Sequence, residues 1–264
     1  MLGAVIGDLA GSIYEYEQLK KVKPIQINKI IEDDAFFSDD TILTIAIADA
    51  ILNNVGYDEK LRGYTRKFEV YRPEHDPYFP TTFSPNFSKW ASGDLKGVSS
   101  GNGAMMRVSP VGYLFDSEED VVKHSYLATI PSHNSEQAIN SARLVALIIY
   151  YFRNSMSKED VIKKLNLNIR KPNITKFNYT CEDTVDVCLY SLFNSNSFEE
   201  SIKLAISFGG DTDTNACIVG SMAEALYGIN DDLKQRALDK LPREFVEILE
   251  SCYEKVNGYK EIIW

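Results

Sequence analysis

Histidine and cysteine are scarce in this sequence of 264 residues, which contains three histidines and four cysteines. They are His75, His124, His133, Cys181, Cys188, Cys217 and Cys252. Histidine is a common ligand of catalytic zinc and iron, so a histidine-rich metal site is not indicated. The cysteines form no CxxC pair, and we expect reduced, buried thiols instead of a disulfide framework or a zinc site. Any bound metal ion is therefore expected to take oxygen ligands.

Long apolar runs and an excess of basic charge are also missing. A helix needs about 20 apolar residues to span a bilayer, and the best candidates, Ile42–Leu52 and Leu144–Phe152, are shorter. Met1–Asp8 lacks a basic region, so we predict no signal peptide and, with the reduced thiols, a cytoplasmic location. The formal net charge of −10 disfavours an extended nucleic-acid surface. We therefore expect neither a membrane nor a nucleic-acid partner.

Helix-type patterns dominate what is present. Hydrophobic residues make up 44% and charged residues 25%, which is ordinary for a globular protein. Because no repeat or linker divides the chain, we predict one compact all-α domain over residues 1–264, and we expect a monomer. The strongest helix predictions are Thr41–Leu52, Ser135–Arg153, Ser197–Phe208, Asn215–Tyr227 and a helix from Pro242 to about Lys255, with another start at Ser157–Asp160. Lys23–Ile31 is the best candidate for a strand.

The segment Tyr64–Trp90 is unusually rich in proline and aromatic residues. Its prolines and main aromatics are Pro73, Pro77, Pro80, Pro85, Tyr71, Tyr78, Phe79, Phe83, Phe87 and Trp90. Prolines at this density exclude a continuous helix. One interpretation is a surface loop held by aromatic packing, and the other is a wall for a planar ligand such as adenine.

Two acidic clusters lie at opposite ends of the chain, each directly before an apolar helix-type segment. The first is Phe37–Thr41 and the second is Gly209–Asn215. Asp, Ser and Thr at a helix start often serve only as caps. A cap needs one acid, however, and each cluster supplies two, which repel each other beside a buried helix unless a cation neutralises them. Converging clusters would form a two-metal centre for Mg²⁺ or Mn²⁺.

Glycines accompany both ends of the chain. The pair Gly209–Gly210 allows a sharp break after a helix, or a plain helix C-cap. Gly3, Gly7 and Gly11 form a stripe of small residues that suits close helix packing. Glu15 follows this stripe, either as a surface acid or as a group that reaches the metal centre.

The middle segment Ser99–Val108 is glycine-rich and then basic. Backbone amides in such a segment can bind phosphate oxygens, although Asn-Gly is also common in turns. Arg107 would bind phosphate or pair with an acid. His133 precedes a predicted helix, where a lone histidine is more often a cap or a core partner than a catalyst.

Taken in order, five segments resemble the ADP-ribosylglycohydrolase family, which includes the dinitrogenase reductase-activating glycohydrolases and the ADP-ribosyl-arginine and ADP-ribosyl-serine hydrolases. The segments are GAVIGDLAGSIYE, SDDT, GNGAMMRVSP, SHNSEQA and GGDTDTNACIVGSMAEALYG. The resemblance covers almost the whole chain and is poor from Tyr57 to Lys96, where we expect target specificity to lie. It implies an all-α fold with a central cleft that holds two Mg²⁺ or Mn²⁺ ions.

The resemblance also implies roles for individual residues. The metal ligands would be Ser38, Asp39, Asp40, Asp211, Asp213 and Thr214, with serine at a position where the family more often has threonine. ADP-ribose would be bound by Ser100, Gly101, Asn102, Gly103, Met105 and His133. The predicted catalytic residues are Glu15, Asp39 and Asp213. Glu15 matches an acid of the serine-directed branch, and its presence favours that branch.

The expected reaction is hydrolysis of the α-linked bond at C1″ of the distal ribose in a protein modified on arginine or serine. Bound cations would fix the ribose hydroxyls, and a carboxylate would activate water or protonate the leaving group. One alternative is a hydrolase of a free metabolite such as O-acetyl-ADP-ribose. Another is a catalytically inactive ADP-ribose-binding relative, against which the intact acidic clusters argue.

Overall fold

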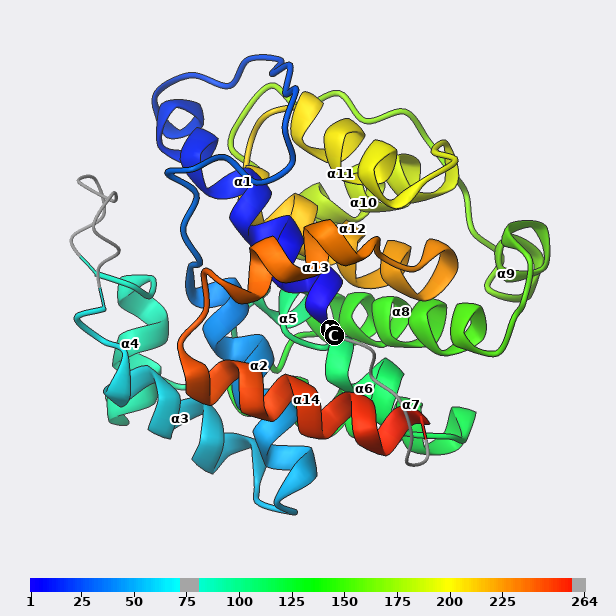
Figure 1. Cartoon of the computed structure of the whole chain (residues 1–264). Coiled ribbons are helices and arrows are strands. Elements are labelled where there is room, and N and C mark those ends of the chain that lie inside the picture. Colours follow the sequence, from blue (N-terminus) through cyan, green and yellow to red (C-terminus); the bar gives the residue numbers. More distant parts are fainter. Residues whose placement is uncertain (72–80, 258–264) are drawn as a thin grey trace.

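The computed structural model describes residues 1–71 and 81–257, and over these residues the chain forms fourteen helices and no strand. The all-α fold that the sequence predicts is therefore confirmed. The helices, shown in Figure 1, are α1 (Leu2–Lys20), α2 (Asp39–Leu52), α3 (Tyr57–Lys67), α4 (Pro85–Ser92), α5 (Gly103–Met106), α6 (Ser109–Leu114), α7 (Glu118–Thr129), α8 (Glu136–Arg153), α9 (Lys158–Lys164), α10 (Cys181–Phe193), α11 (Phe198–Ser207), α12 (Thr212–Tyr227), α13 (Asp231–Leu238) and α14 (Arg243–Asn257).

Helices α1 and α12 cross in close contact at the centre of the molecule (Figure 1). The predicted stripe of small residues forms this contact. A Cβ atom would lie 2.2 Å from the nearest atom of α12 at Gly3, 2.0 Å at Gly7 and 2.3 Å at Gly11, in each case a backbone carbonyl oxygen. No side chain fits at these distances, so the glycines set how closely the two backbones approach.

Helix α2 is buried on almost every side, from Asp40 to Ala50. It packs against α1, α3, α6 and α14, which explains why its sequence is apolar around most of the circumference. In the parts of the chain that the structure describes, no helix has the length and apolarity required to cross a membrane.

The predicted helices form as α2, α8, α11, α12 and α14. Ser135, Ser157 and Ser197 cap the starts of α8, α9 and α11, each accepting a hydrogen bond from the backbone N–H three residues later. The acidic clusters differ from the prediction, because α2 begins at Asp39 and α12 at Thr212. Their acids thus lie in or directly beside the first helical turn, where the helix dipole favours negative charge.

Lys23–Ile31 forms no strand. It belongs to the connection between α1 and α2, where Ile25 N–H donates one hydrogen bond to Ser207 O (3.1 Å). No strand lies beside it among the described residues, and its apolar side chains Ile27, Ile30 and Ile31 are buried in the core instead.

The proline-rich and aromatic segment is partly helical, which differs from the interpretation as a loop. Phe87 and Trp90 belong to α4, where Pro85 occupies the first turn, the helical position that tolerates proline. Phe83 lies just before this helix and stacks on Phe87, with ring centroids 5.8 Å apart. Tyr71 is also described, whereas Pro73, His75, Pro77, Tyr78, Phe79 and Pro80 lie outside the described residues.

Candidate active site

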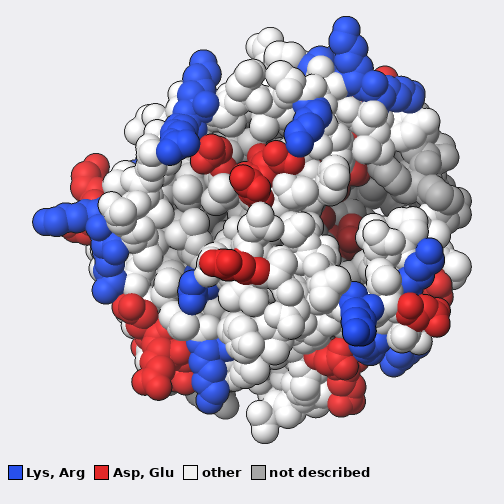
Figure 2. All heavy atoms as spheres, turned by 180° about the vertical axis from the view of Figure 1, so that it is seen from behind, with Lys and Arg blue, Asp and Glu red and all other residues white. Residues whose placement is uncertain are grey.

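A cavity of about 1080 Å³ lies beside the amino-terminal ends of α2 and α12. The view from behind shows acidic side chains deep within a hollow of the surface (Figure 2). The cavity is lined by the predicted site residues Glu15, Ser38, Asp39, Asp40, Ser100, Gly101, Asn102, Gly103, His133, Asp211, Asp213 and Thr214. Met105 is buried and is not among the described lining residues, whereas Met106 is. A binding role for Met105 stays a prediction.

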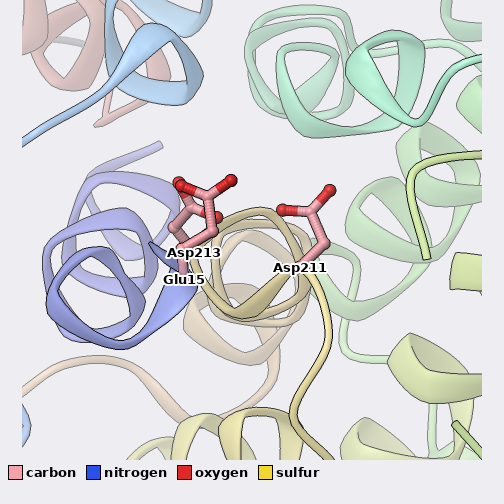
Figure 3. Close-up of side chains that lie close together, drawn as sticks. All are labelled: Glu15, Asp211 and Asp213. Carbon is pink, nitrogen blue, oxygen red and sulfur yellow. The ribbon is translucent and has the colours of Figure 1, made fainter. Parts of the chain in front are cut away.

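The two acidic clusters meet in this cavity. Thr214 Oγ1 donates a hydrogen bond to Asp40 Oδ2 (3.1 Å) and so joins the start of α12 to the start of α2. Glu15, Asp211 and Asp213 offer carboxylate oxygens that lie within 4.8 Å of one another. Figure 3 shows the carboxylates of Glu15 on α1 and Asp213 on α12 side by side, with Asp211 next to them at the helix start. The structure therefore brings together acids from three separate parts of the sequence.

Asp8 holds the first acidic cluster in place, a role that the sequence analysis missed. Asp8 Oδ2 accepts hydrogen bonds from the backbone N–H groups of Ser38 (2.9 Å) and Thr41 (3.0 Å). The hydroxyls of the same two residues donate to Asp8 Oδ1 (2.8 Å) and Oδ2 (2.6 Å). A carboxylate in an otherwise apolar, glycine-striped helix was the available signal, because a buried acid needs such partners.

Asparagines hold the second cluster. Asn102 Nδ2 donates to Asp211 Oδ2 (2.7 Å), and Asp211 N–H donates to Asn178 Oδ1 (2.9 Å). Gly210 has a left-handed backbone with φ of 79°, and a Cβ atom there would lie 2.1 Å from Asn178 Oδ1. The glycine pair thus turns the chain and makes room for the asparagine. Asn178 lies in an irregular segment, and no sequence pattern pointed to it.

The carboxyl groups repel one another strongly. Burial and then the charge of Asp213 raise the pKa of Asp8 to about 7 and that of Asp39 to about 8. The same two causes, in the same order, raise the pKa values of Glu15 and Asp40. Asp213 is therefore at the centre of the repulsion, which a bound cation would relieve.

This repulsion predicts how stability depends on pH and metal ions. A carboxyl group whose pKa is higher in the folded state binds more protons there, so the folded protein loses stability as pH rises from 3.8 towards the folded value of about 8 for Asp39. In EDTA, the melting temperature should be lower at about pH 8 than at about pH 6. Mg²⁺ or Mn²⁺ should raise it more at the higher pH, because the ligands are then deprotonated.

The measurement is a thermal scan at both pH values with EDTA or with the metal. Asp39→Asn is the matched control, and its smaller loss of stability between the two pH values would assign the effect to this cluster. An equal response of the melting temperature to metal at both pH values would contradict the interpretation.

A glycine-rich turn and His133 border the acidic part of the cavity. The turn is fixed by Ser99, whose Oγ accepts from Gly101 N–H (3.0 Å), and by Asn102 N–H, which donates to Tyr179 O (2.9 Å). A Cβ atom at Gly103 would lie only 3.3 Å from His133 Nε2. Because Gly103 has no side chain, the backbone of the turn can lie close to the edge of the His133 imidazole.

Aromatic side chains form another wall of the cavity. Phe83, Phe87 and Trp90 all line it and also pack on one another, with 5.0 Å between the ring centroids of Phe87 and Trp90. The three side chains are buried. These three side chains therefore both pack on one another and line the cavity, and adenine binding stays a prediction.

The structure defines the chain as an all-helical protein with an acid-lined cavity, and sequence comparison assigns it to a family. The sequence profile of the ADP-ribosylglycohydrolase family matches residues 1–261, and the chain belongs to this family. It is thus an enzyme that hydrolyses glycosidic bonds of ADP-ribose.

Individual relatives match most of the chain at low identity. The chain is 24% identical to an ADP-ribosylhydrolase ARH3 of Danio rerio, over 87% of this chain and 82% of the relative. It is 22% identical to an ADP-ribosylarginine hydrolase Tri1 of Pseudomonas putida (strain GB-1), over 94% and 72% of the two chains. A solved structure described as an ADP-ribosylglycohydrolase-related protein complex has the same fold, with a TM-score of 0.73, 19% identity and coverage of 97% and 95%.

Proposed function

We propose that this enzyme releases ADP-ribose from a modified serine or arginine side chain of a protein, with two divalent cations, Mg²⁺ or Mn²⁺, bound among its carboxylates. The observation that carries the proposal is the 3.1 Å hydrogen bond between Thr214 and Asp40, which joins clusters from opposite ends of the chain. Capping two helices requires no such convergence. The names of the relatives, an ADP-ribosylarginine hydrolase and an ADP-ribosylhydrolase, support the same type of bond.

The donor atoms fit hard cations. The proposed ligands are Ser38, Asp39, Asp40, Asp211, Asp213 and Thr214, all of which offer oxygen. Among the described residues, Asp40 Oδ1 is buried without a hydrogen-bond partner, so one carboxylate oxygen is available to a ligand. When bound, such cations would supply neutralisation of the carboxylates and electrostatic stabilisation of the reacting ribose.

Glu15 is the group to which we assign proton transfer. Glu15 is a partly exposed residue that lines the cavity, and its carboxyl group lies beside Asp213 (Figure 3). Burial and the charges of Asp213 and Asp211 raise its pKa. A raised pKa suits a carboxyl group that gives a proton to the leaving acceptor or takes one from water.

The neighbouring walls of the cavity would bind the rest of ADP-ribose. The turn Ser100–Gly103 and His133 would position the diphosphate, because backbone N–H groups and an imidazole N–H are suitable donors to phosphate oxygens. The aromatic wall around Phe87 excludes water from one side of the cavity. Each of these groups orients the substrate towards the acids.

The test is the release of ADP-ribose from serine-linked and arginine-linked peptides, side by side, with Mg²⁺ and again with EDTA. We expect metal-dependent release from one of the two, and Glu15 favours the serine-linked peptide. O-acetyl-ADP-ribose is tested as a third compound, and turnover of this compound alone would identify a metabolite hydrolase. ADP-ribose binding without turnover of any substrate would identify an inactive relative.

A further inference from the structure

Arg107 is a buried cation without an acidic partner. It is 1% exposed, and the ion pairs among the described residues do not include it. Its Nη2 donates to Ser132 Oγ (2.7 Å) and to Ala128 O (3.4 Å), while Nε and Nη1 have no hydrogen-bond partner in the described chain. An isolated buried charge is costly, so its retention beside the cavity calls for an explanation.

The hydrogen bonds continue from Arg107 through Ser132 to His133. Ser132 Oγ lies 2.7 Å from His133 Nδ1, and Arg107 Nη2 lies 3.5 Å from the same nitrogen. A guanidinium only donates. Ser132 Oγ therefore accepts from Arg107, and its own proton is free to donate to the imidazole.

This order of donors fixes where the imidazole proton lies. An N–H at Nδ1 would point at the Arg107 cation and would leave the Ser132 hydroxyl proton without an acceptor among its described contacts, so we take Nδ1 as the acceptor. In a neutral imidazole the proton then resides on Nε2. Burial and the charge of Arg107 lower the pKa of His133, which keeps the ring neutral.

We propose that Arg107 and Ser132 are positioning residues that hold His133 as a neutral imidazole with its N–H on Nε2, directed at the glycine turn where an anionic group of the substrate binds. Nε2 is the atom of His133 closest to the positions that side chains at Gly103 and Gly101 would occupy, 3.3 and 3.5 Å away. The proposal rests on the proposed function, because it assigns the substrate's diphosphate to this turn.

The arrangement gives the site a donor whose protonation does not vary with pH near neutrality. Burial lowers the pKa of Arg107 to about 9, so the guanidinium stays charged at neutral pH. The Phe87 ring makes a cation–π contact with this guanidinium, since its centroid lies 5.7 Å from Arg107 Cζ. A phosphate oxygen at Nε2 would receive a hydrogen bond from the ring and would also partly compensate the buried charge behind it.

The first experiment detects the tautomer in the ligand-free full-length chain by long-range ¹H–¹⁵N NMR of the histidine rings. The chain has three histidines, and His133→Gln assigns the relevant signals by their loss. We expect a proton on Nε2, none on Nδ1, and no titration between about pH 6 and pH 8. A proton on Nδ1, or titration of the ring in this range, would overturn the proposal whether or not the enzyme cleaves ADP-ribosyl peptides.

The second experiment is a double-mutant cycle read out as the dissociation constant for ADP-ribose in Mg²⁺. Ser132→Ala should weaken binding about tenfold, and Ser132→Thr, which keeps the hydroxyl, should restore it. In the His133→Gln background, Ser132→Ala should have almost no further effect, because the hydroxyl acts through the histidine. The same loss in both backgrounds would contradict the proposal.

A matched control removes a buried hydroxyl elsewhere. Ser191 lies in α10, and its Oγ has no hydrogen-bond partner within the described residues. Ser191→Ala should leave both the His133 signals and ADP-ribose affinity unchanged. If it weakens binding as much as Ser132→Ala, the effect of the serine is general destabilisation and the positioning role is wrong.

Discussion

Replacing Asp213 with asparagine should slow ADP-ribosyl hydrolysis about a thousandfold and, in EDTA, raise the melting temperature of the protein. Activity should fall because the proposed metal site loses a charged ligand in the middle of the carboxylate group. Stability should rise because Asp213 is the principal charge that raises the pKa values of Glu15, Asp39 and Asp40. Asparagine keeps the oxygen that accepts from Thr214 N–H (2.8 Å), so the helix start is preserved.

The measurements are hydrolysis rates on whichever ADP-ribosylated peptide the wild-type enzyme cleaves, and thermal scans in EDTA. Asp231→Asn is the control, because this acid also lies at a helix start but its side chain is 86% exposed and pairs with Lys234 on the surface. It should change neither rate nor melting temperature appreciably. Retained hydrolysis in Asp213→Asn would refute the metal-based mechanism, and a lower melting temperature would refute the account of charge repulsion.

Gly7→Ala is expected to have the largest effect on folding. Its methyl group would lie 2.0 Å from Ala216 O, a backbone atom that cannot rotate away. Helices α1 and α12 would have to separate, which should destabilise the protein by about 3 kcal/mol or more. Since Glu15 and Asp213 are carried by these two helices, any protein that still folds should also lose activity.

Gly63→Ala is the matched control for this substitution. Gly63 lies inside α3, and a Cβ atom there would have no neighbour within 4 Å. Removing a helical glycine at an open position should stabilise the protein by about 0.5–1 kcal/mol. Urea unfolding curves of both variants give the comparison. Gly7→Ala with a free energy of unfolding equal to that of the wild type would show that the contact is not close in solution.

The sequence predicted the helices well where a local pattern was sufficient. The apolar residues of α2 and the serine caps at Ser135, Ser157 and Ser197 each act within a few positions along the chain. The acidic clusters were also visible locally, because two consecutive or alternating acids exceed what a cap needs. Whether the two clusters converge could not be predicted from the sequence, because it depends on how α2 and α12 pack.

The supporting residues could not be predicted in the same way. Asp8 and Asn178 acquire their roles only when segments distant in sequence are brought beside them, as shown by the hydrogen bonds that Ser38 N–H donates to Asp8 and Asp211 N–H donates to Asn178. Met106 lines the cavity, whereas Met105, whose binding role stays a prediction, is buried beside it in the short helix α5. Single residues of this kind follow from tertiary packing, which no periodic pattern encodes.

The contact between α1 and α12 has a consequence for the order in which the enzyme matures. A protein is synthesised from its amino terminus, so Glu15 and Asp39 leave the ribosome well before Asp213. Until α12 follows, the glycine face of α1 has no partner, and contacts between such distant segments form slowly. Hydrolysis of ADP-ribosyl bonds should therefore begin only after the late segments have folded onto the early ones, so that a nascent chain is inactive.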